Sequence, residues 1–201
     1  MASGKRVKIV RDESIGNKQW NSTNVNEWVD STMQVYLNDI YNFDILSKKM
    51  IGKSKWYLGG RGNNSANGDI FYSSERSETV YNVDRSTNWI GFVGLMYPSD
   101  YIYTYALRVD DVCYNTPISC RTDAGAYPSL GWLYRSGYNQ WTMSSRSSNT
   151  NSVFYIHSAG LVNFISANNS NGNGSLTVYL DRDVKITSGD GTIDNAYKLS
   201  M

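Results

Sequence analysis

The sequence predicts an α+β fold in a single domain, because helical patterns gather towards the N-terminus and strand patterns dominate the second half. Apolar residues recur at helical spacing between Trp28 and Tyr41, whereas Val153 to His157 keeps the alternation of a strand. The two patterns do not alternate along the chain as they do in βαβ proteins. With 201 residues, the chain is long enough to bury a core as one domain.

Two helices are expected in the first half of the chain. The first is predicted to begin at Asn24, with Asn24 as N-cap and Glu27 at the N3 position. Its apolar stripe runs from Trp28 to Tyr41 and predicts a face that packs on the core. A second, shorter helix is expected from Ser47 towards Trp56.

Strands and apolar segments are expected at several further places. A strand is predicted at Trp89 to Tyr97, where Pro98 would stop it. The other segments are Val7 to Val10, Trp132-Leu133, Trp141 to Met143, Leu176 to Leu180 and Val184 to Ile186.

The stretch from Trp141 to Gly174 combines a polar, low-complexity composition with strand-like alternation. It is rich in Ser and Asn and contains no Asp, Glu or Lys. A disordered tail has no reason to keep an apolar residue at every second position. Phe154 and Ile156 are therefore expected on one side of a strand, with Tyr155 and His157 on the other. After a turn at residues 158–160, a returning strand is expected from Leu161 to Phe164.

The residue types of this stretch favour a recognition surface over a reaction site. Small polar and aromatic side chains supply the adaptable hydrogen bonds and rigid contact area that binding surfaces use. Strands fix the directions of such side chains better than loops do, so affinity would come from a preorganised platform.

Charge and hydropathy give no indication of a nucleic-acid or membrane partner. The chain has 19 Lys and Arg against 18 Asp and Glu, for a formal net charge of +1, and its sequence shows no basic cluster with interleaved aromatics. No apolar run approaches the roughly 20 residues that cross a bilayer. Residues 1–6 lack the apolar core of a signal peptide and are interpreted as an N-terminal remnant before a domain at 7–201.

The two cysteines, Cys113 and Cys120, lie close together in a polar segment that contains Pro117. A disulfide between them would close a short loop and contribute about 2–3 kcal/mol. The alternative is a pair of free thiols in a reducing compartment. Two ligands are too few for a structural zinc site.

Catalytic and metal-binding readings receive little support from the motifs. His157 is the only histidine, and no Gly-x-Ser-x-Gly elbow accompanies it. Asp110-Asp111 lacks the ligand spacing of a calcium loop. The run at residues 59–62, Gly-Gly-Arg-Gly, lacks the Lys-Ser/Thr of a phosphate-binding loop and predicts an ordinary loop. We therefore expect no enzyme activity, no cofactor and no metal.

Several phrases, in this order, resemble a family of gut-bacterial surface proteins. They are Val7-Lys8-Ile9-Val10-Arg11-Asp12-Glu13-Ser14-Ile15-Gly16, Gly94-Leu95-Met96-Tyr97-Pro98-Ser99-Asp100-Tyr101, Gln140-Trp141-Thr142-Met143-Ser144, Val178-Tyr179-Leu180 and Val184-Lys185-Ile186-Thr187-Ser188-Gly189-Asp190-Gly191. The family resembled is that of the variable proteins of diversity-generating retroelements, which have a C-type-lectin-like fold and are often pilin-like or otherwise displayed on the surface. In such systems adenine-directed mutagenesis rewrites codons near the C-terminus.

The resemblance implies a variable region at 141–174 with fixed and variable positions in alternation. The fixed positions would be Phe154, Ile156, Ser158, Gly160 and Val162. The variable positions, expected to contact a ligand, would be Tyr155, His157, Ala159, Leu161 and Asn163, extended to Ser145, Arg146, Ser148, Asn149, Asn151, Phe164, Ser166, Asn168 and Asn169. This chain departs from the family at 174–177, where Gly-Ser-Leu-Thr replaces a usual Gly-Val-Arg-Pro and an anchoring Arg is missing.

The expected function is thus non-enzymatic recognition or adhesion at a cell surface, directed at a protein or glycan ligand. Two alternatives remain open. One is a structural pilus or phage-tail component whose Ser/Asn surface is only solvated. The other is an oxidase related to formylglycine-generating enzymes, which share the lectin-like fold and are expected to use a reactive cysteine pair.

Overall fold

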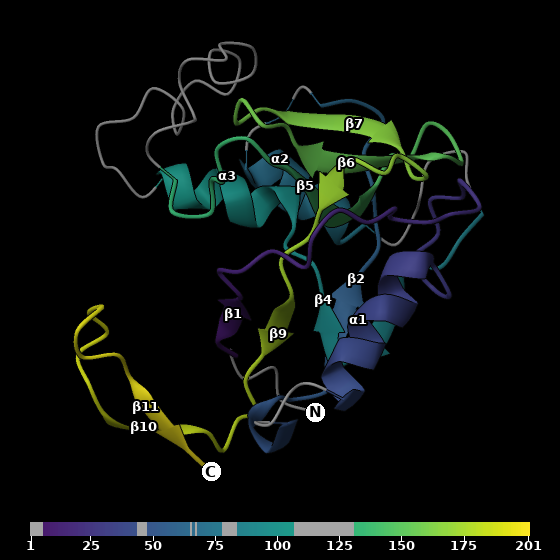
Figure 1. Ribbon diagram of the computed structural model, residues 1–201. Helices are drawn as coiled ribbons and strands as arrows, with labels where there is room; N and C mark the ends of the chain where they lie inside the picture. Colours follow the sequence, from purple (N-terminus) through teal and green to yellow (C-terminus); the bar gives the residue numbers. More distant parts are fainter. Residues whose placement is uncertain (1–5, 44–47, 65, 67, 78–83, 107–130) are drawn as a thin grey trace.

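The computed structural model of the protein describes residues 6–43, 48–64, 66, 68–77, 84–106 and 131–201, and it has the α+β class that the sequence predicts (Figure 1). Its helices are α1 (Thr32–Phe43), α2 (Gly68–Glu75) and α3 (Pro98–Ala106), with a 3-10 turn at Lys48–Met50. Its strands are β1 (Lys8–Val10), β2 (Ser54–Tyr57), β3 (Asn88–Gly91), β4 (Val93–Gly94), β5 (Asn139–Ser145), β6 (Ser152–Ile156), β7 (Val162–Ser166), β8 (Gly172–Asn173), β9 (Thr177–Tyr179), β10 (Lys185–Ser188) and β11 (Lys198–Ser200).

The main sheet has four strands in the order β7-β6-β5-β8. β5 pairs antiparallel with β6 and parallel with β8, and β6 pairs antiparallel with β7. A smaller sheet, β1-β9-β4, brings distant parts of the sequence together by placing Lys8 opposite Tyr179. β2 and β3 form a separate antiparallel pair.

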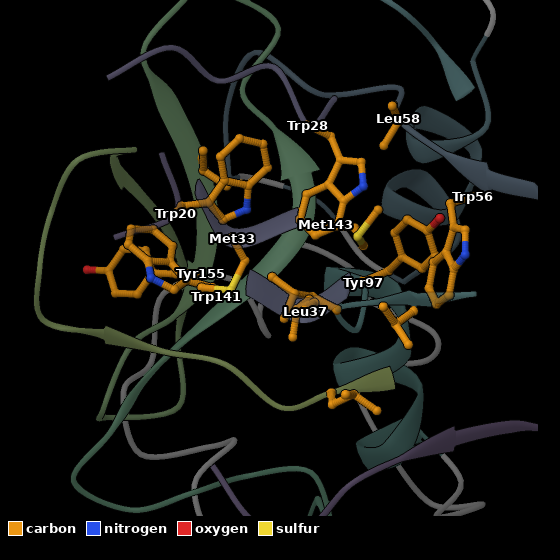
Figure 2. Close-up of a cluster of buried hydrophobic side chains, with 14 of the residues drawn as sticks. Trp20, Trp28, Met33, Leu37, Trp56, Leu58, Tyr97, Trp141, Met143 and Tyr155 are labelled. Carbon is orange, nitrogen blue, oxygen red and sulfur yellow. The ribbon is translucent and has the colours of Figure 1, made fainter. Parts of the chain in front are cut away.

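Two hydrophobic clusters hold the main sheet between them. The first, which we call the tryptophan cluster, gathers Trp20, Trp28, Trp56 and Trp141 around Met33 and Leu37 of α1, as Figure 2 shows. The second, which we call the helical cluster, joins Phe71 of α2 and Tyr101 of α3 to the sheet. In Figure 1, α2 and α3 lie beside the main sheet, while α1 lies against the lower part of the molecule.

The first helix begins later than the sequence predicts. The expected start at Asn24 is wrong: Asn24 and Asp30 have positive φ angles of 58° and 61°, which a right-handed helix does not allow. The N-cap is Ser31, whose Oγ accepts a hydrogen bond from the Gln34 amide at 3.2 Å. The predicted apolar stripe is confirmed, because Met33 and Leu37 are fully buried.

The predicted helix from Ser47 towards Trp56 is wrong beyond the 3-10 turn. β2 replaces its second half because Ser54 and Trp56 point inwards while Lys55 points out, which is the period of a strand. The predicted strand at Trp89 to Tyr97 is interrupted, since β3 ends at Gly91 and β4 covers only Val93–Gly94.

The sequence analysis missed α2 and α3. Pro98 begins α3 where it was expected only to stop a strand, since proline is favoured at the first helical position. Asp100 accepts a hydrogen bond from the Tyr97 amide at 2.8 Å, which is half of a capping box. From the other side, buried Glu75 at the end of α2 accepts from the Ser99 amide at 3.0 Å. The two helices are therefore joined end to end by one carboxylate.

The predicted segments at Val7 to Val10, Trp141 to Met143, Leu176 to Leu180 and Val184 to Ile186 contain β1, part of β5, β9 and part of β10. Trp132-Leu133 lies in a turn. β10 and β11 form a hairpin that extends away from the rest of the molecule at the C-terminal end (Figure 1), with Ile193 at its tip 98% exposed. Among the described residues, no helix has the length and apolarity needed to span a bilayer.

Candidate functional site

The predicted hairpin is present as β6 and β7. The strands pair in continuous register from Ser152 opposite Ser166 to Ile156 opposite Val162. The His157 amide donates to Leu161 O at 2.7 Å, and the Gly160 amide donates to His157 O at 2.7 Å. Gly160 has φ +84°, a conformation that a residue with a Cβ rarely adopts. These bonds close the turn where the sequence places it.

β6 does not have the solvent-facing side that the alternation predicts. All five of its residues are buried. Val153 and Tyr155 belong to the tryptophan cluster, while Phe154 and Ile156 belong to the helical cluster. The alternation therefore distributes side chains between two cores, not between a core and water.

Two of the predicted contact residues are consequently buried. Tyr155 is only 7% exposed, and its ring packs edge-on against Trp141 with 6.1 Å between centroids (Figure 2). Burial raises the pKa of its hydroxyl. Ser145 is 4% exposed because it lies in β5, and its hydroxyl donates to the backbone oxygen of Asn26. Neither side chain is available to a ligand.

The other predicted contact residues keep solvent access and form three groups. One group lies where β5, β6 and β7 meet their loops; the second lies along β7; the third surrounds the hairpin turn. The first group is Ser148, Asn149, Asn151, Ser166, Asn168 and Asn169. The second is Arg146, Asn163 and Phe164, and the third is His157, Ala159 and Leu161. Because β6 has five residues at about 3.3 Å each, the first and third groups are roughly 15 Å apart.

The first group forms one surface from two loops, which we call the loop surface. The Ala167 amide donates to Asn151 O at 2.8 Å, which brings the end of β7 onto the β5–β6 loop. Gln19 reaches Asn168 O through Nε2 at 2.7 Å. The N-terminal segment is therefore hydrogen-bonded to the loop surface.

Asn26 organises the β5–β6 loop from below. It is 1% exposed, and its Nδ2 donates to the backbone oxygens of Arg146, Asn149 and Ser152 at 3.0, 3.1 and 2.7 Å. Its own amide donates to Thr150 O at 2.8 Å. One buried side chain thus contacts three backbone oxygens of the same loop. Sequence reasoning missed it because it interpreted Asn26 as part of a helix start.

Arg85 completes this support. Its Nη1 donates to Asn26 Oδ1 at 2.6 Å and its Nη2 to Arg146 O at 3.2 Å. Burial lowers the pKa of Arg85 to about 10, and the nearby charge of Glu27 acts in the opposite direction. Nothing local in the sequence marks Arg85, since its partners are more than fifty residues away.

The Gly-rich run at residues 59–62 is a loop, as predicted, and it packs along the same region. A Cβ on Gly60 would lie 2.1 Å from Ser145 O, so only glycine lets the two backbones approach this closely. The Ser147 amide donates to Arg61 O at 2.9 Å. The glycines therefore serve packing under the loop surface.

Arg146 packs against a side chain of β7. Its guanidinium carbon is 3.8 Å from the centre of the Phe164 ring, a cation–π contact, and its Nε donates to Gly62 O at 2.8 Å. Phe164 itself packs edge-on against buried Phe154, with 6.0 Å between centroids. Arg146 and Phe164 therefore form a partly exposed aromatic–cation pair with a fixed geometry.

β7 is an edge strand, and two of its outward backbone groups already have local partners. The Phe164 amide donates to Asn163 Oδ1 at 2.8 Å, and Val162 O accepts from Asn64 Nδ2 at 3.4 Å. Such side-chain bonds discourage pairing with another strand. Recognition at β7 would therefore depend on side chains.

The turn group is held by tyrosines. Tyr134 donates to Ser158 O and Tyr101 donates to Gly160 O, both at 2.9 Å. The Ala159 amide donates to His157 Nδ1 at 3.0 Å, which fixes the imidazole relative to the turn. His157 is therefore a partly exposed, oriented side chain.

The segment at 174–177, Gly-Ser-Leu-Thr, is buried. The amides of Ile15 and Arg11 donate to Gly174 O at 2.9 Å and Leu176 O at 2.8 Å. Backbone pairing with the N-terminal segment thus holds it in place.

Among the described residues, no group of three or more His, Cys, Asp or Glu could hold a metal ion. Cys113 and Cys120, with Asp110-Asp111, lie outside the described residues, so their predicted roles are neither supported nor contradicted.

Comparison of the chain with protein-family models, with curated proteins and with solved structures finds no match.

Proposed function

We propose that this protein is a non-enzymatic recognition domain with a C-type-lectin-like fold, whose loop surface and β7 side chains vary through a diversity-generating retroelement. One observation carries the proposal. The accessible candidate residues, such as Ser148, Asn151 and Asn168, lie on loops at the end of a sheet in which β6 is buried on both faces. Side chains on this surface can change while the two clusters continue to stabilise the fold.

The chemistry of the surface suits a protein or glycan ligand. Asn149 uses its amide groups within the loop, but Asn151, Asn168 and Asn169 present amide side chains at the surface. The Arg146–Phe164 pair adds a fixed cation and an aromatic edge. Polar, adaptable contacts around a rigid aromatic anchor are typical of binding surfaces that must accept changing partners. A lectin-like fold by itself does not imply sugar binding.

The geometry of His157 supports recognition over catalysis. In a Ser-His-Asp relay, Nδ1–H donates to a carboxylate, but here Nδ1 accepts the Ala159 amide. A displayed recognition domain would act outside the cell, and we propose a cell-surface location for this reason.

A library test follows from the arrangement. Residues Ser148, Asn151, Asn163, Asn168 and Asn169 would be randomised together and the library selected against immobilised proteins and glycans. We expect folded binders whose affinity depends on the selected residues. A matched library at the buried positions 153–156 should yield almost no folded protein, and equal yields from the two libraries would contradict the proposal.

A second candidate function is a structural component that self-assembles, and the C-terminal hairpin favours it. β10 and β11 project from the molecule and expose Ile186, Ile193 and Tyr197. Sedimentation of the intact protein and of Ile193→Asp separates the two functions. Concentration-dependent assembly that the substitution abolishes supports a structural role, whereas a monomer in both cases favours recognition alone.

A further inference from the structure

A basic pocket lies away from the β6–β7 hairpin, between the β1-β9-β4 sheet and α2. Its cavity has a volume of about 520 Å³. Five cationic side chains line it, and none of its lining residues is acidic: the cations are Arg6, Lys53, Lys55, Arg76 and Arg182. They come from the segment before β1, from β2 and the residue preceding it, from the residue after α2 and from the segment after β9.

This concentration of charge does not follow from composition. The chain has 19 Lys and Arg against 18 Asp and Glu, so an average patch of surface would be nearly neutral. Nor is it visible as a basic run, because the fold assembles it from distant segments. A concave surface lined with one sign of charge focuses the potential and attracts the opposite charge.

Arg6 is held in a defined position. Its Nη1 donates to Lys53 O and to Ser54 Oγ, both at 2.7 Å. A Cβ on Gly52 would lie 2.7 Å from the same nitrogen, so the guanidinium packs closely against the backbone at Gly52. Arg6 is thus fixed at the wall of the pocket.

Arg76 is held by aromatic rings. Its guanidinium carbon lies 3.3 Å from the centre of the Tyr72 ring and 5.1 Å from that of Tyr57. Nη1 also donates to Tyr72 O at 3.1 Å and pairs with Glu75 at 3.3 Å, where the Glu75 side chain is 1% exposed. Stacking therefore orients a planar, fork-like donor towards the pocket, which is the group best suited to oxyanions.

Glu75 pairs with Arg76, but two other nearby carboxylates have partners that do not line the pocket. Asp100 pairs with Lys8 at 2.7 Å. Asp181 Oδ1 accepts the Asp183 amide at 3.2 Å, which turns this carboxylate towards its own backbone. The cations of the pocket are therefore not neutralised from its rim by these two groups.

We propose that this pocket binds a small ligand that carries two or more sulfate or phosphate groups. Its volume lies within the range of about 300–1,000 Å³ that small-molecule sites occupy. Fixed guanidinium groups supply directed hydrogen bonds, and the exposed Lys53 and Lys55 supply additional charge. No lining residue belongs to the candidate hairpin surface, so this is a separate site.

Isothermal titration of the intact protein tests the proposal with two probes, a heparin-derived tetrasaccharide and inositol hexakisphosphate. The pocket variant is Lys53→Gln/Lys55→Gln/Arg182→Gln, and the control is Lys185→Gln/Lys198→Gln on the C-terminal hairpin. We expect at least one probe to bind, the pocket variant to bind it about tenfold more weakly or worse, and the control to stay within about twofold. Thermal melting of each variant checks that the fold is retained.

The two probes also distinguish a sulfated ligand from a phosphorylated one. Binding of the tetrasaccharide alone assigns a sulfated saccharide, and binding of the inositol phosphate alone assigns a phosphorylated small molecule. Absence of binding by both, or equal weakening in the control variant, overturns the proposal. Tighter binding of single-stranded DNA than of either probe overturns it as well. None of these results depends on whether the hairpin surface is variable.

Discussion

β6 and β7 are paired residue by residue, yet their surroundings are opposite. Every residue of β6 is buried, whereas every residue of β7 keeps partial solvent access. β6 lies between β5 and β7 and separates two hydrophobic clusters, while β7 is at the edge of the sheet. The comparison teaches that position in the sheet, more than polarity pattern, decides which residues can change.

The largest effect should come from two phenylalanines that lie directly opposite each other. Phe154 is fully buried, and Phe164 is half-buried beside Arg146. Phe154→Ala should lower the free energy of unfolding by about 3–5 kcal/mol, because a cavity opens in the helical cluster. Phe164→Ala should cost clearly less, since part of its surface is already in water. Urea unfolding measures both, and equal losses would contradict the difference between the strands.

The pH dependence of stability tests the burial of Glu75, the residue that joins α2 to α3. Burial raises the pKa of Glu75 to about 7, above its ordinary value of 4.5, while hydrogen bonds from Ser99 partly oppose this. The folded state therefore binds the proton more tightly than the unfolded chain. The contribution of Glu75 to stability is full below about pH 4.5 and is lost as the pH rises to about 7, by about 3 kcal/mol in total.

Glu75→Gln is the matched control for this titration, because an amide oxygen can still accept from the Ser99 amide. Subtracting the unfolding free energies of the variant from those of the parent protein isolates the contribution that Glu75 makes to stability at each pH. If this difference does not change between pH 4.5 and 7, burial does not raise the pKa of Glu75.

The stability of the loop surface should depend on the buried Asn26 more than on the exposed residues of the loop surface. Asn26→Ala should cost about 2 kcal/mol, because three backbone oxygens and Arg85 lose a buried partner. Asn151→Ala, at an exposed position of the same loop, should change stability by less than about 0.5 kcal/mol. Amide hydrogen exchange should also increase across residues 146–152 in the first variant only. An unchanged exchange pattern would argue that the loop does not need Asn26.

The smallest effect is expected at the Arg146–Phe164 pair. Arg146→Met keeps the aliphatic stem but removes the cation and the bond to Gly62 O, and should cost about 1 kcal/mol. Ser148→Ala removes only a hydroxyl bond to the same oxygen and serves as the control. If the two variants were equally stable, the contact between Arg146 and Phe164 would contribute nothing measurable.

The sequence predicts the class of the fold and the position of the hairpin because both depend on local patterns. Val153 to Ile156 and residues 158–160 carry their strand and turn signals within a few residues. The same stretch also contains an unbroken apolar run, which is typical of a strand buried on both faces, and this signal identifies Tyr155 as a core residue.

Other features depend on contacts that no local pattern records. Ser145 is buried because β5 is covered by Asn26, which is 119 residues away in the chain. The basic pocket likewise assembles from separate segments. Pro98 was interpreted as the end of a strand because proline does stop strands, but it is equally favoured at the start of a helix. Only the capping bond from the Tyr97 amide to Asp100 decides between these two roles.

The most direct test of the central claim is deep sequencing of the source locus, with its flanking DNA, across a natural population. The account predicts adenine-directed substitutions beside a near-identical template repeat, concentrated in the codons of accessible residues such as Ser148, Asn151 and Asn168. Codons 153–156 should stay almost unchanged. Silent changes scattered evenly across the gene, with no template nearby, would contradict a diversified surface.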